Sequence, residues 1–228
     1  MNLMKSIQYS HERRRLKIAR MFKLYGSPGT VSLVTRVAFE ELGLEYEFVS
    51  LSVKDGEHLP PEYRAVHPLA RVPALEIAPG EILTETPAIL SYLAELVPDA
   101  ELMPRDPLAR ARAAEWMSLL SSAVHVAFIS FFRPSRFVED DGAEALRRDG
   151  KTRFFQLLQH VEHRLPAAGF VLGERYSLCD AYVTVFFLWA RHFGLPVAEL
   201  PRYSRLAGAV LARPAVRRTL ELEGLKAA

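Results

Sequence analysis

The sequence predicts two joined units of different class, a small mixed α/β sheet with helices and then an all-helical region. From residue 22 to about 96, short extended runs alternate with helical patterns. Beyond a proline-rich stretch at 97–107, hydrophobic residues recur only at helical spacing. The chain has 228 residues, half of them hydrophobic, so it can bury a core in both units.

The first unit is expected to be a βαβ unit followed by a ββα unit. We predict a strand at 23–25, a helix at 30–42 closed by Gly43, a strand at 45–51, and a loop with a short helix up to residue 67. An extended run after Pro73 and the residues 81–83 form a hairpin around Pro79-Gly80, and a helix follows at 87–96. Such a pattern is typical of a small mixed sheet covered by helices.

The second unit contains three predicted helices, at 108–131, 142–165 and 177–193. The first of them is apolar around much of its circumference, so we expect it to be buried on several sides or to lie in an interface. Ser177 is suited to cap the third helix, and Asp180 can reach back to the Ser177 N–H. This pair is interpreted as a structural cap.

These patterns divide the chain into a tail at 1–20, a first domain at 21–97, a linker at 98–106 and a helical domain at 107–228. The tail carries six basic residues and one acidic residue, whereas the rest carries 23 basic and 26 acidic residues. Three interpretations of the tail stay open: a start assigned upstream of Met21, a basic arm, or a targeting segment. The acidic balance of the rest argues against nucleic-acid binding.

Composition also bears on location and redox chemistry. No uninterrupted apolar run reaches the roughly eighteen residues of a membrane span, so no membrane association is expected. Cys179 is the single cysteine of the sequence, which excludes an internal disulfide. We therefore expect a cytoplasmic protein.

Residues 70–92 are the most informative part of the chain for function. Pro73 stands at the head of an extended run, where a missing N–H is tolerated only at an edge or at a cis turn. Val72 would then present its N–H and C=O to the backbone of a small extended ligand. Glu85 and Thr86 open the next helix, whose free N–H groups favour a carboxylate.

This segment resembles the glutathione-binding half of the cytosolic glutathione transferases, which carry a Val-Pro pair before the third strand and a Glu-Ser or related pair opening the third helix. Residues 22–33 are similar to the first strand and active-site loop of the bacterial, beta-like members, and residues 177–182 match the family's Ser/Thr-x-x-Asp box. The three motifs occur in the family's order over residues 21–222. The resemblance implies a thioredoxin-like domain packed on an all-helical domain, and a homodimer.

The resemblance implies a set of glutathione-binding residues. Val72, at the Val72-Pro73 bond, would pair with the ligand backbone, while Glu85 would meet its α-amino group and Thr86 its α-carboxylate. The alternative is that Glu85 and Thr86 only cap their helix. Three further residues are candidates for the glycine carboxylate: Arg71, Lys54 and His58.

Catalysis requires a lower pKa for the glutathione thiol, which ordinarily ionises near 8.5. Thr30 and Ser32 offer hydroxyl groups in the loop after the first strand, and Val31 offers a backbone N–H. His125 resembles the histidine that beta-like enzymes extend toward the sulfur, and a core histidine is the alternative. Burial would keep His125 neutral. Ser27 is interpreted as a turn former.

Two departures from the beta-like pattern affect the chemistry. Val31 stands where those members carry a cysteine, and Gly26 stands where they carry a tyrosine. A mixed disulfide on the protein is therefore not expected, and Cys179 is expected to be buried and a poor substitute. Arg133 and Arg136 either line a pocket that favours anionic substrates or are solvated.

The sequence thus predicts a detoxifying glutathione transferase that joins the glutathione thiolate to a small hydrophobic electrophile, with glutathione as cosubstrate and no metal. One alternative is a glutathione-dependent isomerase or reductive enzyme. The Ser-Ser-Cys run of maleylacetoacetate isomerases is, however, absent from Gly29-Thr30-Val31. The other alternative is a noncatalytic binding or regulatory protein of the same fold.

Overall fold

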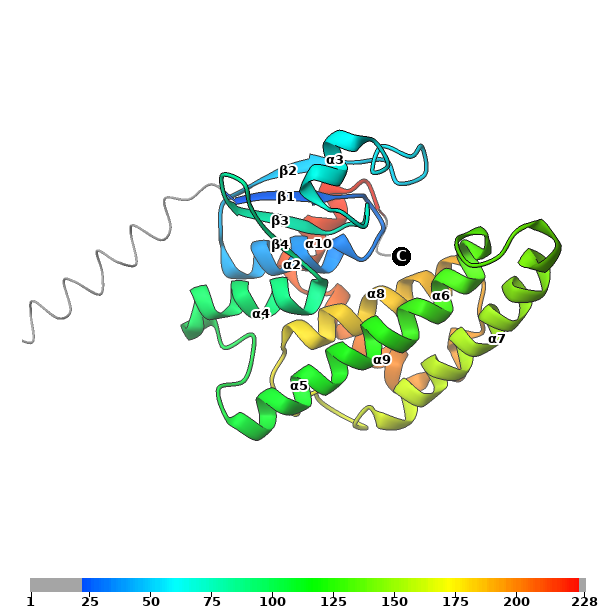
Figure 1. Cartoon of the computed structure of the whole chain (residues 1–228). Coiled ribbons are helices and arrows are strands. Elements are labelled where there is room, and N and C mark those ends of the chain that lie inside the picture. The colour runs from blue at the N-terminus through cyan, green and yellow to red at the C-terminus, as the bar shows by residue number, and fades with distance from the viewer. Residues whose placement is uncertain (1–21, 226–228) are drawn as a thin grey trace, which may run out of the picture.

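The computed structural model describes residues 22–225 (Figure 1). The predicted basic tail at 1–20 lies outside the described residues, as do Met21 and residues 226–228.

A four-stranded sheet of order β2-β1-β3-β4 forms the first part of the molecule. β1 (Phe22–Gly26) pairs with β2 (Tyr46–Ser50) in parallel and with β3 (Ala74–Ala78) in antiparallel orientation, and β4 (Glu81–Thr84) completes the hairpin. The expected βαβ and ββα order is therefore confirmed. Parallel strands need a crossover, and the helix after β1 supplies it.

Three helices accompany the sheet: α2 (Ser32–Leu42), α3 (Pro61–Val66) and α4 (Thr86–Leu96). Figure 1 shows α2 and α4 between the sheet and the helical part, with α3 on the other side of the sheet. Gly43 ends α2 in the left-handed conformation, with φ 61°, as its position after the periodic run predicts. α2 begins two residues later than expected because residues 27–31 form a turn.

The second part is built from helices. It contains η1 (Pro98–Ala100), α5 (Pro107–Leu119), the π-helical turn η2 (Leu120–Val124), α6 (His125–Phe132), η3 (Pro134–Arg136), α7 (Asp140–Arg164), α8 (Leu178–His192), η4 (Val197–Glu199), α9 (Pro201–Leu211) and α10 (Pro214–Leu222). The sequence predicted bounds for three of these stretches, α5–α6, α7 and α8, and every predicted end lies within two residues of the observed one.

The continuous helix α5–η2–α6 carries two apolar stripes, and only one of them is buried. Trp116, Leu120 and Phe131 are buried, whereas Leu108 and Val126 on the other stripe are exposed. The expectation of burial on several sides is therefore not met within one chain. Its alternative, an interface, stays a prediction.

The same helix, Pro107–Phe132, is long and apolar enough to cross a membrane by length and composition. No membrane span was predicted from the sequence, because polar residues interrupt the apolar run within this helix. A core helix of a soluble protein meets the same two criteria, so this finding does not by itself indicate a membrane protein.

α8 is the central helix of the second part, and most of its side chains are buried. Its start carries the predicted capping box, in which the Asp180 carboxylate accepts the Ser177 N–H at 2.8 Å and the Ser177 hydroxyl at 2.8 Å. The same carboxylate accepts the Val171 N–H at 2.7 Å. The cap thus also holds the segment that enters α8.

The last helix, α10, returns to the first part and packs against α2 (Figure 1). Arg213 donates to both carboxylate oxygens of Glu41, at 2.5 and 2.8 Å, and Arg218 donates to Glu40 at 2.8 Å. The two parts are therefore joined by a bidentate charged pair as well as by apolar packing.

We expect Asp180→Ala to lower the free energy of unfolding by about 3 kcal/mol, because it leaves several buried donors without an acceptor. Urea unfolding followed by circular dichroism measures this change. Asp149→Ala is the matched control, since Asp149 lies on the surface in a pair with Arg153, and it should change stability by less than about 1 kcal/mol. Equal losses in the two variants would contradict the structural role of the cap.

Candidate active site

Three chain segments meet at one end of the sheet. Tyr25 of β1 pairs with Ala74 of β3, and Ala74 pairs with Thr84 of β4. The segments that follow β1, precede β3 and follow β4 therefore lie side by side. They carry most of the predicted site residues: Thr30, Val31, Ser32, Arg71, Val72, Pro73, Glu85 and Thr86.

The β1–α2 loop (residues 27–32) is held by its own hydroxyl groups. The Ser27 carbonyl accepts the Thr30 hydroxyl at 2.7 Å and the Ser32 hydroxyl at 3.0 Å, and the Ser27 N–H donates to Ser32 Oγ at 3.0 Å. Ser32 is fully buried, whereas Thr30 is partly exposed. Ser32 therefore shapes the loop, and Thr30 is the hydroxyl that remains within reach of a ligand. The turn role of Ser27 is consistent with these contacts.

Val31 lies at the N-terminus of α2. Its side chain is buried in the core, so only its backbone can meet a ligand. The first turn of α2 contains no acidic residue, and the N–H groups of a helix start carry a partial positive charge. The position thus offers a thiolate a backbone donor rather than a reactive side chain.

Gly26 precedes this loop in a space that excludes any side chain. A Cβ atom built on Gly26 would lie 2.7 Å from the Phe48 ring and 2.8 Å from Ser32 Oγ. The absence of a tyrosine here is therefore matched by the packing of Phe48 from the neighbouring strand. Arg36 stacks on the same ring, with its guanidinium carbon 4.1 Å from the ring centre.

The Gly29 peptide of the loop is held on both sides by the helical part. Trp189 Nε1 donates to the Gly29 carbonyl at 2.8 Å, and the Gly29 N–H donates to Glu223 Oε2 at 2.9 Å. Arg36 approaches the other Glu223 oxygen at 3.8 Å. Burial raises the pKa of the Glu223 carboxyl to about 7, although the Gly29 N–H and Arg36 oppose the shift.

His125 is the first residue of α6, directly after the π-helical turn. Its ring centre lies 5.4 Å from that of Trp189 and 5.8 Å from that of Phe186. Because Trp189 binds the Gly29 carbonyl, His125 lies one side chain away from the loop. Burial, with the charges of Arg71 and Arg136, lowers its pKa to about 4, so the ring is neutral near pH 7, as expected from sequence.

The Val72-Pro73 bond is cis, one of the two alternatives that the sequence left open. Val72 precedes the paired part of β3, so the sheet does not use its N–H and C=O. The buried Tyr63 hydroxyl donates to the Arg71 carbonyl at 2.6 Å. This contact fixes the backbone immediately before Val72.

Glu85 precedes α4 with φ 67°, an uncommon conformation for a residue with a side chain. Its side chain is exposed and forms no cap hydrogen bond, so the alternative that Glu85 only caps the helix is not supported. Thr86 is 5 % exposed. Burial raises the pKa of Tyr182, and a hydrogen bond with the Thr86 side chain opposes this shift. Pro87 occupies the first turn, as predicted.

The remaining candidates lie beside the segment between β2 and α3. Lys54 is exposed, His58 is buried, and Arg133 Nη2 donates to the Val53 carbonyl at 3.1 Å.

Cys179 is fully buried, as predicted, and burial raises the pKa of its thiol to about 12. It is therefore not a nucleophile near neutral pH.

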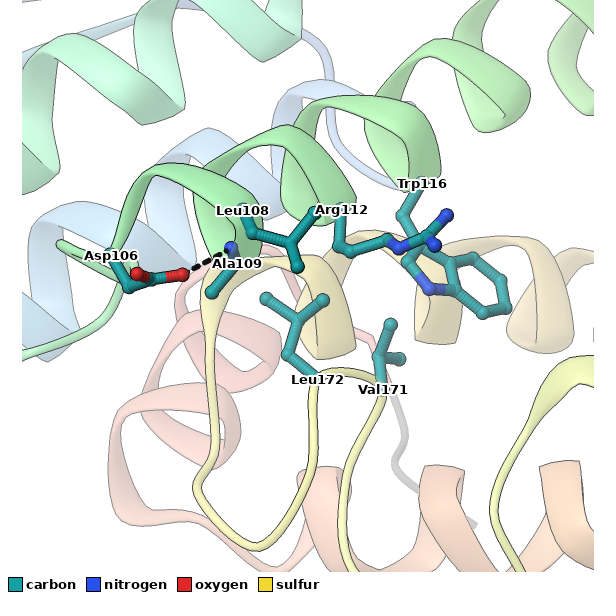
Figure 2. A pocket seen from close by; sticks show the side chains of 7 residues that line it. All are labelled: Asp106, Leu108, Ala109, Arg112, Trp116, Val171 and Leu172. Atoms are coloured by element: carbon teal, nitrogen blue, oxygen red, sulfur yellow. Dashed lines mark hydrogen bonds between the residues drawn. The ribbon is translucent and has the colours of Figure 1, made fainter.

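A hollow of about 370 Å³ lies elsewhere, between the start of α5 and the segment before α8 (Figure 2). Its lining residues are Asp106, Leu108, Ala109, Arg112, Trp116, Val171 and Leu172. It contains none of the predicted site residues. Within residues 22–225 no group of three or more His, Cys, Asp or Glu residues is placed to hold a metal ion.

Tyr63, Trp189 and Glu223 were not predicted as site residues. Trp189 is one of many apolar residues in the predicted helix at 177–193, and the other two belong to no motif. Glu223 follows an amphipathic helix that also carries Arg217, Arg218 and Glu221, so no local signal distinguishes it.

This arrangement defines a class. A thioredoxin-like sheet with a cis-proline edge, a hydroxyl-rich loop opening a helix, and a helical domain packed against that loop together form the glutathione transferase fold. Residues 21–95 match the family model of the glutathione S-transferase N-terminal domain.

The chain belongs to the glutathione S-transferase family. It is 31 % identical to the glutathione S-transferase GstA of Escherichia coli O157:H7 over 90 % of this chain and 100 % of the relative. It is 32 % identical to a maleylacetoacetate isomerase of Pseudomonas aeruginosa, with 87 % and 93 % covered.

Solved structures agree. A glutathione transferase homologue from Sulfitobacter with bound glutathione has a TM-score of 0.85 at 33 % identity, covering 90 % of this chain and 99 % of that one. A beta-class glutathione S-transferase of Sphingomonas chungbukensis has a TM-score of 0.78 at 32 % identity, covering 90 % and 100 %.

We predict that Glu223→Gln removes a pH dependence of stability. The folded pKa of about 7 lies above the ordinary value of 4.5, so the stability from the neutral carboxyl is present below about pH 4.5 and is lost as the pH rises through about 7. The glutamine can still accept the Gly29 N–H. At about pH 8 the variant should be the more stable by about 2 kcal/mol, with little difference at about pH 5.

Urea unfolding at the two pH values measures the difference. Glu223→Ala is the companion variant, because it removes the acceptor as well as the charge and should be less stable than Glu223→Gln at both. Parallel pH profiles for wild type and Glu223→Gln would show that Glu223 does not titrate in this range.

Proposed function

We propose that the protein catalyses conjugation of the glutathione thiolate to a small electrophile. The observation that carries this proposal is the Val31 N–H at the acid-free start of α2, in a loop fixed on both sides of Gly29. A fixed donor aimed at a charged sulfur stabilises the thiolate without reorganisation during the reaction. Family membership and glutathione-bound neighbours support glutathione as the cosubstrate.

Glutathione would bind along the exposed backbone at Val72-Pro73. The unused N–H and C=O of Val72 suit its extended backbone, and Arg71 beside them suits a terminal carboxylate. The γ-glutamyl end would meet Glu85 through its α-amino group and Thr86 with the N–H groups of α4 through its α-carboxylate. The Glu85 carboxylate is exposed and makes no capping hydrogen bond, which supports this orientation.

Thiolate formation would release the thiol proton to solvent, and the sulfur would then attack the electrophile. Val31 N–H and the Thr30 hydroxyl are the proposed donors, and the Thr30 hydroxyl would exchange its bond to the Ser27 carbonyl for one to the sulfur. Ser32 supports them through the Thr30 hydroxyl, 2.9 Å away. Neutral His125 is proposed as a hydrogen-bonding group on the electrophile side.

A glutathione-dependent isomerase is a second candidate. A relative with that name is 32 % identical and is covered over 93 % of its length. Such a reaction would use the same thiolate, because reversible attack and release of glutathione permits rotation about a double bond. It would differ only in leaving no conjugate as product.

Assembly and location follow from family membership as proposals. The exposed stripe of α5–α6, with Leu108 and Val126, is available for a second copy of the chain. Bacterial relatives of this kind support a cytoplasmic protein. The first domain at 21–97, the linker at 98–106 and the helical domain at 107–228 are retained as proposed boundaries.

We expect Glu85→Gln to weaken glutathione binding about tenfold, since it removes the charge proposed to meet the α-amino group. Isothermal titration calorimetry gives the dissociation constant. Glu81→Gln is the control, because Glu81 is an exposed acid on β4 of the same hairpin. Unchanged affinity in Glu85→Gln would exclude an ionic role for Glu85.

We expect Thr30→Val to raise the pKa of the bound glutathione thiol by about one unit, because about 1.4 kcal/mol of thiolate stabilisation is lost with the hydroxyl. Thr30→Ser should preserve the pKa. Ultraviolet thiolate absorbance across pH measures it. If both variants titrate like the wild type, stabilisation rests on Val31 N–H and the helix start alone.

A further inference from the structure

Two arginines lie just after the end of α6, near the sheet domain. Arg133 follows the last residue of α6, and Arg136 ends η3. Arg133 Nη2 donates to the Val53 carbonyl at 3.1 Å, which ties this corner to the segment between β2 and α3. Figure 1 shows that segment and the α6–α7 connection on the same side of the molecule.

A third arginine belongs to the same group. Burial and the charges of Arg133 and Arg71 lower the pKa of Arg136, so the guanidinium of Arg71, next to the Val72 edge, lies close enough to act on Arg136. The charges of Arg71 and Arg136 also contribute to the lowered pKa of His125. Arg71 comes from the sheet domain, and Arg133 and Arg136 come from the helical domain, so cationic groups of both domains lie near His125. We call Arg71, Arg133 and Arg136 the arginine cluster.

Several arginines between the two parts are paired, Arg213 with Glu41, Arg218 with Glu40 and Arg36 with Glu223. Among the side chains that the structure describes, no ion pair of this kind involves the arginine cluster. Neighbouring like charges destabilise the free protein, and an anion that binds among them removes this repulsion.

His58 provides an independent observation. It lies in the segment tied by Arg133, its side chain is 3 % exposed, and its Nδ1 atom has no hydrogen-bond partner. Burial and the charges of Arg133, Arg136 and Arg64 lower its pKa. A buried ring nitrogen without a partner, among cationic groups, is a polar atom that a bound group can satisfy.

Apolar side chains border the arginine cluster. Phe132 is 40 % exposed, and the Arg133 guanidinium carbon lies 5.5 Å from its ring centre. Phe137, directly after Arg136, is 52 % exposed. Exposed aromatic rings beside unpaired guanidinium groups suit a ligand with both an apolar body and a carboxylate.

We propose that Arg133 and Arg136 of the arginine cluster bind a carboxylate of the second substrate, so that the enzyme selects aromatic electrophiles that carry a carboxylate. This inference rests on the proposed function and makes the substrate class more specific than a hydrophobic electrophile. Arg71 contributes from the glutathione side, and His58 contributes the unpartnered nitrogen. The same cationic groups can also meet the glycine carboxylate of glutathione, and the experiment separates these two sources.

The test compares two aryl chlorides of the same shape, a chlorodinitrobenzoate and the matching chlorodinitrobenzamide. In each reaction the glutathione sulfur bonds to the ring carbon that carries chlorine, chloride leaves with the bonding electrons, and the thiol proton passes to solvent. Each rate is divided by the uncatalysed rate with glutathione. The chemically made conjugates of both compounds are also titrated by calorimetry, so that binding is measured independently of turnover.

We expect the wild type to bind the carboxylate conjugate about tenfold more tightly than the amide conjugate, and to show the same preference in normalised kcat/KM. Arg136→Gln should abolish this preference while the dissociation constant of glutathione changes less than about twofold. Arg136→Lys should retain part of it. Arg148→Gln, an exposed residue of α7, is the control for net charge, and thermal unfolding checks that each variant is folded.

Two results would overturn the inference. One is equal affinity of the wild type for the two conjugates. The other is a loss in Arg136→Gln that weakens glutathione and both conjugates alike, which would assign the arginine cluster to the glycine carboxylate. Turnover of the amide reports on the proposed function separately, because it requires the thiolate and no carboxylate.

Discussion

The active-site loop depends on the two hydrogen bonds that hold the Gly29 peptide. Both partners, Trp189 and Glu223, belong to the helical part, so the loop takes its final position only when the two parts are packed together. Each bond contributes about 1 kcal/mol net, but a buried peptide group left without its partner costs more. The loop that carries the Val31 N–H is therefore fixed by residues that lie 160 and 194 positions after Gly29.

Trp189 connects the loop at Gly29 to His125, which is proposed to face the second substrate. It stacks on Phe128 at 4.2 Å and contacts His125 at 5.4 Å while its indole N–H binds Gly29. The π-helical turn before His125 changes the rotation of α6 relative to α5, which places the histidine among these rings. A change in the aromatic core would consequently move both the loop and the histidine.

Local signals predicted the parts of the fold that depend on neighbouring residues. Gly43, Pro87 and the Ser177–Asp180 box each act within one turn of a helix, so their patterns were sufficient. The sequence predicted the loop hydroxyls of Thr30 and Ser32 together as candidates, and only their burial in the structure distinguishes them. Glu223 could not be assigned, because its partner Gly29 is 194 positions away and no periodicity records such a contact.

Val31, at the position where the beta-like pattern predicts a cysteine, bears on which atom can react. The valine side chain packs into the core, and Cys179, the one cysteine of the sequence, is buried with a pKa of about 12. No protein sulfur can therefore form a mixed disulfide with glutathione at this site under ordinary conditions. The proposed nucleophile is therefore the sulfur of glutathione itself, on which we propose that the protein acts through a backbone N–H, a hydroxyl and the field of a helix start. A site of this proposed kind would favour thiolate addition over thiol–disulfide exchange, because electrostatic stabilisation lowers the thiol pKa without supplying a second sulfur.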